Sequence, residues 1–136
     1  MKAKKKYKNQ NYLDLSPKIK KLFENFGFKK IPNTGKPYYA ATKQGKICRV
    51  IDKNKLKEMK DGATPTQYGY VKIKQTDGTY KEIGTHRLIA SFIDNPENKP
   101  VVNHKAIYRN HNRIDELEWC TQSENMRHYY EHKKRS

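Results

Sequence analysis

The chain has few cysteines, few acidic residues and no long hydrophobic run. Its two cysteines, Cys48 and Cys120, stand far apart and outside any C-x-x-C pair. This spacing argues against a zinc knuckle and favours burial as small apolar side chains, although a zinc site that combines them with histidines stays an alternative. Because no run is long enough to cross a bilayer and no signal-type segment is present, we expect no membrane partner and a cytoplasmic setting.

The scarcity of acidic residues leaves a large positive charge. Lys and Arg number 30 against 14 Asp and Glu, for a net charge of +16. Such an excess predicts a polyanionic partner, namely DNA, RNA or an anionic membrane surface. The apolar fraction is only 34%, although 10 Tyr and 4 Phe add bulk, so a thin core is expected in a chain that suits one domain or one domain with a small appendage.

The first half of the chain predicts a basic arm, a helix and two short strands. Residues 1–15 form a lysine-rich arm that is expected to be flexible. Ser16-Pro17 is a helix start and Gly27 a helix stop, with apolar residues at helical spacing between them. Strands are expected at 38–41 and 47–51, around the Gln44-Gly45 turn, and a helical turn or loop at 56–61.

Residues 68–83 predict a β-hairpin. The alternating segment 68–74 is followed by Asp77-Gly78 and by a second short strand at 80–83. The alternation places Tyr68, Tyr70, Lys72 and Lys74 on one face and Val71 and Ile73 on the other. Two interpretations stay open: an amphipathic hairpin with a wet basic face, or a ribbon that lies on a nucleic acid groove.

The last part of the chain predicts a helix, two strands and a final helix. Thr85 is the expected N-cap of a helix over 86–93, and strands are expected at 100–103 and 117–121. Thr121 and Glu124 match a capping box, which starts the final helix. Asn125 then lies in the first turn of that helix, on the same face as His128.

This order of elements suits hydrolysis of a phosphodiester bond. The reaction needs an activated water and help for the departing oxygen. His104, at the end of the first strand of the pair, can take a proton near pH 7 and is the candidate base. Asn125 offers a carboxamide oxygen to a hard cation. Asn103 is the strand neighbour of His104, and because strand neighbours point opposite ways, a strand end or kink must bring both to one site.

Residues 85–128 resemble the HNH endonucleases, especially the phage homing enzymes. The segment upstream resembles a small nuclease-associated module, with Tyr39, Gly45-Lys46-Ile47 and the start of the hairpin as the matching pieces. The pieces that match the HNH pattern are His86-Arg87-Leu88-Ile89-Ala90, Phe92, residues 95–100, Val102-Asn103-His104, Asn112-Arg113, Leu117-Glu118-Trp119, Thr121 and Glu124-Asn125.

The resemblance implies an α+β fold of small antiparallel strands with a C-terminal ββα-metal unit. It implies a metal-dependent endonuclease that acts on double-stranded DNA, as a monomer or a homodimer, in the cytoplasm of a phage host. The implied cofactor is one divalent ion, Mg²⁺ or Mn²⁺, with Asn103 and Asn125 as its ligands. The implied division is an arm at 1–15, a helix-plus-hairpin module at 16–84 and the nuclease module at 85–136.

The chain departs from the family pattern in the middle of the motif. Glu116 stands where the family usually has an Asn that tethers the loop, and an ionised Glu can accept but cannot donate hydrogen bonds. Asn112 is a candidate substitute tether, so the catalytic set is His104, Asn112 and Glu116. Asn103 replaces a frequent Asp and brings no charge to a metal. The alternative function is a catalytically degenerate HNH-fold protein that only binds DNA.

Basic residues near the expected site are candidates for phosphate contacts. His86 is expected to have a structural role, and Trp119 is expected in the core under the site. The predicted DNA-binding residues are Lys72, Lys74, Arg87, Lys105, Arg109, Arg113 and Arg127.

Overall fold

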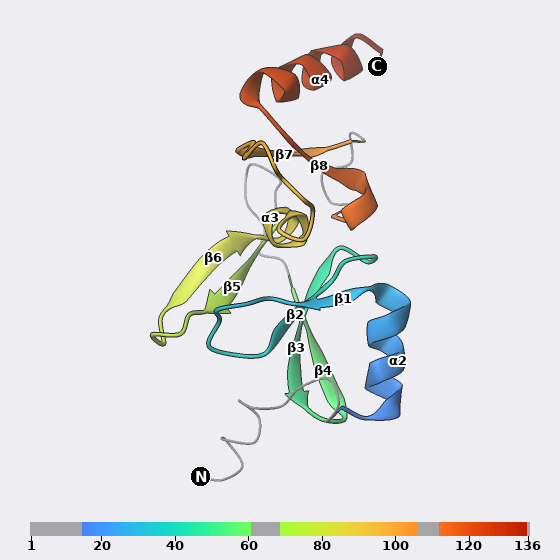
Figure 1. The fold of residues 1–136 in the computed structure, drawn as a ribbon, viewed down its shortest axis with the longest axis vertical. Coiled ribbons are helices and arrows are strands. Elements are labelled where there is room, and N and C mark those ends of the chain that lie inside the picture. The colour runs from blue at the N-terminus through green and yellow to red at the C-terminus, as the bar shows by residue number, and fades with distance from the viewer. Residues whose placement is uncertain (1–14, 61–68, 106–111, 136) are drawn as a thin grey trace.

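The structure is a computed structural model that describes residues 15–60, 69–105 and 112–135. Tyr68 and Arg109 therefore lie outside the described residues, and so does the predicted basic arm except for Leu15. The fold is α+β with small antiparallel strands, as the sequence predicted. In Figure 1 the first helices and strands of the chain lie in the lower half of the view and the last ones at the top. The helices and strands are α2 (Pro17–Phe26), β1 (Phe28–Lys30), β2 (Tyr38–Ala41), β3 (Lys46–Asp52), β4 (Lys55–Met59), β5 (Tyr70–Lys74), β6 (Tyr80–Gly84), α3 (Thr85–Ala90), β7 (Val101–His104), η2 (Ile114–Glu116), β8 (Leu117–Cys120) and α4 (Gln122–Arg135).

Strands β1 to β4 form one antiparallel sheet in sequence order, and α2 packs on one of its faces (Figure 1). The predicted ends of α2 are confirmed. The Ser16 hydroxyl accepts a hydrogen bond from the Ile19 N–H, and Gly27 adopts the left-handed conformation that ends the helix. Ile19 and Phe23 on α2 are buried against Tyr39 and its neighbours on the sheet.

The opposite face of this sheet carries the main core. The β5–β6 hairpin, α3 and the β7–β8 pair all contribute side chains to it, so one apolar cluster joins the first half of the chain to the last. Ile73 of β5 and Ile89 of α3 are fully buried in this cluster. The shared cluster fixes the position of the β7–β8 pair relative to the sheet.

The predicted hairpin is present as β5 and β6, which pair in regular antiparallel register. Val71 and Ile73 are buried and Lys72 is exposed, as the alternation predicted. The turn contains Gly78 at φ 92°, a conformation that glycine adopts without strain.

Two local predictions are wrong. The segment 56–61 was expected as a helical turn or loop, but Lys55–Met59 is strand β4. Leu56 and Met59 pack into the clusters on opposite faces of the sheet. This burial on both sides favours a strand over a turn. Thr85 is not an N-cap: the cap position is Gly84, and Thr85 is the buried first residue of α3, which ends at Ala90 rather than at 93.

The elements predicted at the end of the chain are present. Strands β7 and β8 pair antiparallel from Val101 opposite Cys120 to His104 opposite Leu117. The capping box is confirmed by reciprocal hydrogen bonds, with the Thr121 N–H donating to Glu124 Oε1 and the Glu124 N–H donating to Thr121 Oγ1. This pair begins α4 directly after β8.

Candidate functional site

His104 and Asn112 form the buried centre of the candidate site. His104 is the last residue of β7, and its Nε2 lies 2.8 Å from Asn112 Oδ1. Both side chains are buried. An amide oxygen can only accept, so the contact assigns the ring proton to Nε2 and makes Nδ1 the basic nitrogen. The structure thus brings together two of the three predicted catalytic residues.

The position of Asn112 depends on the turn between β2 and β3. Gly45 in this turn has φ 71°, and a Cβ placed on it would lie 2.5 Å from the Asn112 carbonyl carbon. The next segment is held by a hydrogen bond from the Ile114 N–H to the Thr42 carbonyl, at 2.9 Å. Sequence reasoning identified the turn but not this contact, because residues almost 70 positions apart carry it.

Glu116, the third predicted catalytic residue, makes one contact through its side chain and one through its backbone. Its carboxylate pairs with the Arg113 guanidinium, and its carbonyl accepts a hydrogen bond from the Lys105 N–H at 2.8 Å. The second bond joins the two ends of the 105–116 segment through backbone atoms. The Glu116 side chain is therefore not needed for this particular tether.

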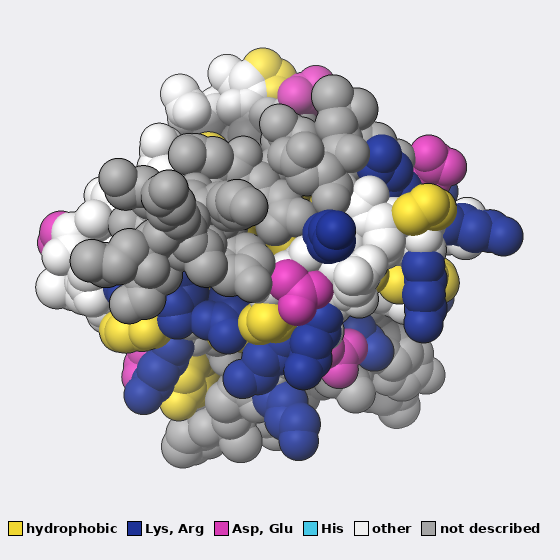
Figure 2. Space-filling view, turned by 90° about the horizontal axis from the view of Figure 1, so that it is seen from below, with side chains coloured by type: hydrophobic (Ala, Val, Ile, Leu, Met, Phe, Trp, Pro, Cys, Tyr) yellow, Lys and Arg dark blue, Asp and Glu magenta, His cyan; other side chains and the backbone are white. Residues whose placement is uncertain are grey.

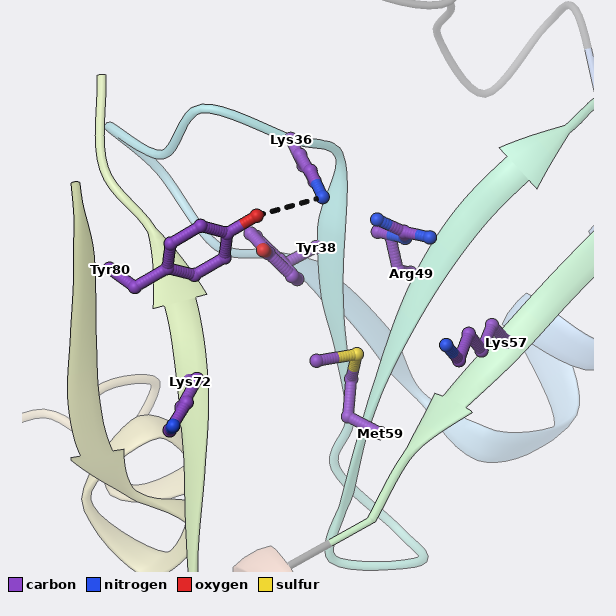
Figure 3. A pocket seen from close by; sticks show the side chains of 7 residues that line it. All are labelled: Lys36, Tyr38, Arg49, Lys57, Met59, Lys72 and Tyr80. Atoms are coloured by element: carbon purple, nitrogen blue, oxygen red, sulfur yellow. Dashed lines mark hydrogen bonds between the residues drawn. The ribbon is translucent and has the colours of Figure 1, made fainter. Parts of the chain in front are cut away.

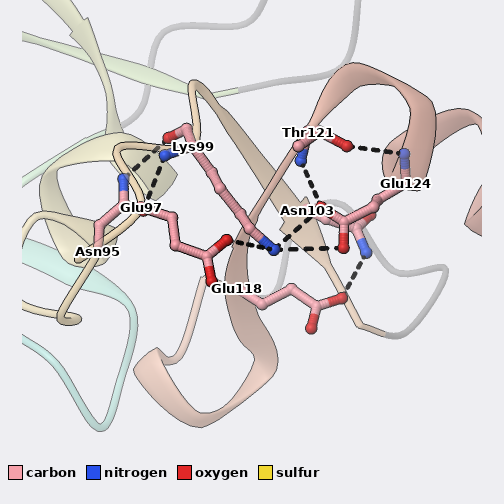
Figure 4. A network of polar contacts seen from close by, with 7 residues as sticks. All are labelled: Asn95, Glu97, Lys99, Asn103, Glu118, Thr121 and Glu124. Carbon is pink, nitrogen blue, oxygen red and sulfur yellow. Dashed lines mark hydrogen bonds and ion pairs between the residues drawn. The ribbon is translucent and has the colours of Figure 1, made fainter.

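Asn103 is buried beside a carboxylate. Its Nδ2 donates to Glu118 Oε1 at 3.0 Å, and the two residues are opposite partners in the β7–β8 pair (Figure 4). Glu118 was not predicted as part of the site, although it stands in the Leu-Glu-Trp motif. Because Nδ2 is engaged, the amide oxygen of Asn103 is the atom left for another ligand. Regular register continues through His104, so the two neighbours have separate partners, Glu118 and Asn112.

Asn125 lies half-buried in the first turn of α4, which packs against β7. Hydrogen bonds fix this end of the helix on both sides. His128 Nε2 lies 2.9 Å from the Lys105 carbonyl at the end of β7. Lys99, just before β7, binds Glu124 at 3.0 Å (Figure 4). The Thr121 N–H and then Lys99 lower the pKa of Glu124 to about 2, so this carboxylate stays ionised in the capping box.

His86 lies beside His104, with the ring centroids 5.5 Å apart. Burial, and then the nearby His104 and Arg87, lower the pKa of His86 from 6.5 to about 4. The ring is therefore neutral at pH 7 and does not place a positive charge next to His104. This geometry agrees with the structural role predicted for His86.

We expect His86 to make the protein less stable in mild acid. Its pKa is lower in the folded chain than in the unfolded chain, so between pH 6.5 and about 4 the unfolded chain binds the extra proton first. The free energy of unfolding should fall across this window and should fall less in His86→Gln. Urea unfolding of both proteins at pH 7.5 and pH 4.5 measures the difference. Equal losses in the two proteins would contradict the prediction.

Most residues predicted to contact DNA lie on the described surface. Lys72, Lys105, Arg113 and Arg127 are exposed, whereas Lys74 is half-buried. Arg87 is exposed and lies over the Trp119 ring, 5.6 Å from its centroid. The half-buried Trp119 packs against the main core as predicted and donates its Nε1–H to the Ala90 carbonyl.

The donor atoms at the site suit a hard cation better than zinc. Cys48 and Cys120 are both buried as expected, and burial raises the pKa of the Cys48 thiol to about 11, which opposes metal binding as a thiolate. Within the described ranges, no group of three or more His, Cys, Asp and Glu side chains could hold a metal. The amide oxygens of Asn103 and Asn125 fit an ion such as Mg²⁺, which keeps several waters and accepts phosphate oxygens as ligands.

Comparison with known proteins gives a consistent picture. No protein-family model matches the chain. An uncharacterized HNH endonuclease of Acanthamoeba polyphaga mimivirus is 41% identical over 92 residues, which cover 67% of this chain and 27% of that protein. A second one from the same virus is 36% identical over 104 residues, covering 74% and 25%. The chain therefore spans about a quarter of the length of these relatives.

The solved structure that describes DNA binding and cleavage by the HNH homing endonuclease I-HmuI has the same fold. The TM-score is 0.64 at 23% sequence identity, over 77% of this chain and 58% of that chain. In the part of the chain that the structure describes, no helix combines the length and apolarity that crossing a bilayer requires. By its fold and by its sequence relatives alike, the chain groups with the HNH endonucleases.

Proposed function

We propose that the chain acts as a metal-dependent DNA endonuclease of the homing type, which hydrolyses phosphodiester bonds in double-stranded DNA. The observation that carries the proposal is the buried hydrogen bond between His104 and Asn112 at the end of β7. It orients a histidine ring at the point where the sequence pattern requires a base. The relatives named HNH endonucleases and the fold shared with I-HmuI support the same reaction class.

His104 is the base in this mechanism. Its Nδ1 takes a proton from a water that attacks phosphorus, while the bond from phosphorus to the 3′ oxygen breaks. Asn112 keeps the ring in the required tautomer by accepting a hydrogen bond from the Nε2–H, and it stabilises the charged ring that forms. Because the neighbouring His86 is neutral, it does not repel the positive charge that forms on His104.

Asn103 and Asn125 are the proposed holders of the divalent ion. Glu118 binds the Asn103 amide nitrogen and so presents the amide oxygen as the ligand. The capping box and the His128 contact set the position of the α4 turn that carries Asn125. When bound, the ion supplies charge stabilisation at the phosphate and the departing oxygen.

The DNA partner follows from charge. The chain carries a net charge of +16, and exposed basic residues lie on the hairpin, α3 and α4. We further place the protein in the host cytoplasm, in keeping with its viral relatives. A monomer would nick one strand and a homodimer would cut both, so the cleavage pattern reports the oligomeric state.

The second candidate function is DNA binding by a degenerate HNH fold. Two observations favour it: both proposed metal ligands are neutral amides, and the Glu116 carboxylate forms an ion pair with Arg113. Neutral ligands hold a cation less firmly than carboxylates do. This candidate shares the fold and the DNA partner and lacks only the reaction.

Incubation with supercoiled plasmid distinguishes the two candidates. The endonuclease is expected to convert plasmid to the nicked or linear form with Mg²⁺ or Mn²⁺ and to lose this activity completely in EDTA. Restoring the ion in excess should restore the rate. A protein that binds DNA in a gel-shift assay but leaves plasmid and viral DNA intact with either ion would instead support the degenerate candidate.

A further inference from the structure

A cavity of about 380 Å³ lies between the β1–β4 sheet and the β5–β6 hairpin, outside the His104 site. Its walls come from separate elements: Tyr80 and Lys72 from the hairpin on one side, and Arg49 and Lys57 from the sheet on the other (Figure 3). Its lining residues are Lys36, Tyr38, Arg49, Lys57, Met59, Lys72 and Tyr80, none of them acidic. The cavity therefore combines four cations with two tyrosines.

The two cations on the sheet are placed directly opposite each other. Arg49 of β3 and Lys57 of β4 are register partners, on the same face of the sheet as Tyr38. Like charges in directly opposed positions of an antiparallel pair destabilise it. Glu58, the acid on β4, belongs to the other face, where it pairs with Lys46 at 2.8 Å. The arrangement costs stability unless an anion lies between the two cations.

Arg49 has unused donor capacity. Among the described residues, its Nε is buried without a hydrogen-bond partner. A guanidinium presents a planar fork of donors that matches the oxygens of a phosphate. Lys72 differs from Arg49 and Lys57, because the residue opposite it across the hairpin is an acid, the exposed Glu82. Arg49 and Lys57 are therefore the centre of the positive charge in this cavity.

The walls of the cavity are held in place. Tyr38 Oη accepts a hydrogen bond from the Lys74 N–H at 3.0 Å, and Lys36 Nζ lies 3.3 Å from Tyr80 Oη. The first bond joins the sheet to the hairpin and the second joins the segment before β2 to the hairpin tip. Figure 2 shows the molecule from below, and Lys and Arg side chains gather on the face that is in view. Long-range attraction would therefore bring anions towards it.

We propose that this cavity is a binding site for a phosphate group, held by Arg49 and Lys57 and bordered by the Tyr80 ring. A phosphate neutralises the opposed pair and supplies acceptors for the guanidinium fork. The group can be carried by the DNA backbone, where the site would anchor DNA away from His104, or by a free nucleotide. Only the DNA-borne form rests on the proposed function.

The test compares Arg49→Gln and Lys57→Gln with the double variant Lys18→Gln/Lys21→Gln, whose exposed lysines lie on α2 across the sheet. The first arm titrates inorganic phosphate and thymidine 5′-monophosphate at constant ionic strength and follows the backbone amide signals of β3 and β4 by NMR in every protein, with chloride as the blank. The second measures the affinity for a 20-base-pair duplex in EDTA. Because no arm requires cleavage, a failed nuclease proposal leaves the test intact.

Relative to wild type, the affinity is expected to be about 10- to 100-fold lower in Arg49→Gln and Lys57→Gln and unchanged in the α2 variant. Saturable binding of the free compounds identifies a free phosphate group, whereas a selective loss of duplex affinity alone identifies a DNA phosphate. Lys57 is exposed, so Lys57→Gln should fold and should not lower Tm in chloride, since it removes the like-charge pair. The proposal is overturned if the free compounds bind no better than chloride and all variants lose duplex affinity equally.

Discussion

Replacing His104 with alanine is expected to lower the rate of plasmid nicking by about 10²- to 10⁴-fold, the usual contribution of a positioned base. The ring is buried at the end of β7 with Nε2 bound to Asn112, so a surface residue cannot substitute for it. The rate is measured as the loss of supercoiled plasmid under single-turnover conditions with Mg²⁺. The same variant should bind DNA in EDTA as wild type does, because the buried ring is not part of the exposed basic surface.

Asn112→Asp is the matched control for this variant. A carboxylate also accepts a hydrogen bond from the Nε2–H of His104, so the orientation of the ring is kept and nicking should persist with a shifted pH profile. Asn112→Ala removes the acceptor and should lower the rate towards that of His104→Ala. Nicking by His104→Ala at the wild-type rate would contradict the assignment of the base.

Replacing Ile89 with alanine is expected to lower the free energy of unfolding by about 2–5 kcal/mol. Ile89 is fully buried in the cluster that joins the sheet, the hairpin, α3 and the β7–β8 pair. The truncation removes buried methyl groups and leaves a cavity where these elements meet. Urea unfolding gives the change, and the loss should be seen by probes in both halves of the chain because they share this core.

Met126→Ala is the control for the core variant. Met126 is 49% exposed on α4, so its truncation should change the free energy of unfolding by no more than about 0.5 kcal/mol. A loss below about 1 kcal/mol for Ile89→Ala would show that the cluster does not hold the two halves together. Separate unfolding transitions of the two halves in wild type would also contradict a shared core.

The elements that sequence reasoning located correctly are those specified by neighbours along the chain. The Ser16 cap, the Gly27 stop and the Thr121–Glu124 box each depend on residues at most a few positions apart. The hairpin follows from alternation, which requires only that one face be buried. The errors, at β4 and at Thr85, fall where burial against distant residues decides the conformation.

The candidate site shows the same division. The order of motifs was enough to select His104, Asn103 and Asn125, and to predict the family that the relatives and the fold then confirmed. The roles of these residues in metal binding and catalysis stay predictions. The sequence did not indicate that Glu118 binds Asn103, because that contact joins partners across two strands. The sequence indicated Gly45 as a turn residue and as part of the resemblance to the nuclease-associated module, but not that it makes the space in which Asn112 reaches its position beside His104.

The sequence by itself therefore determined the local elements, the positive charge and the reaction class to be tested. Only the tertiary structure decided that Asn112 accepts a hydrogen bond from the His104 ring and that Arg49 faces Lys57 in a cationic cavity. The physical reason is the range of the interactions. Caps and alternation are set within a few residues, whereas strand register and packing bring together side chains whose separation along the chain carries no signal of their contact.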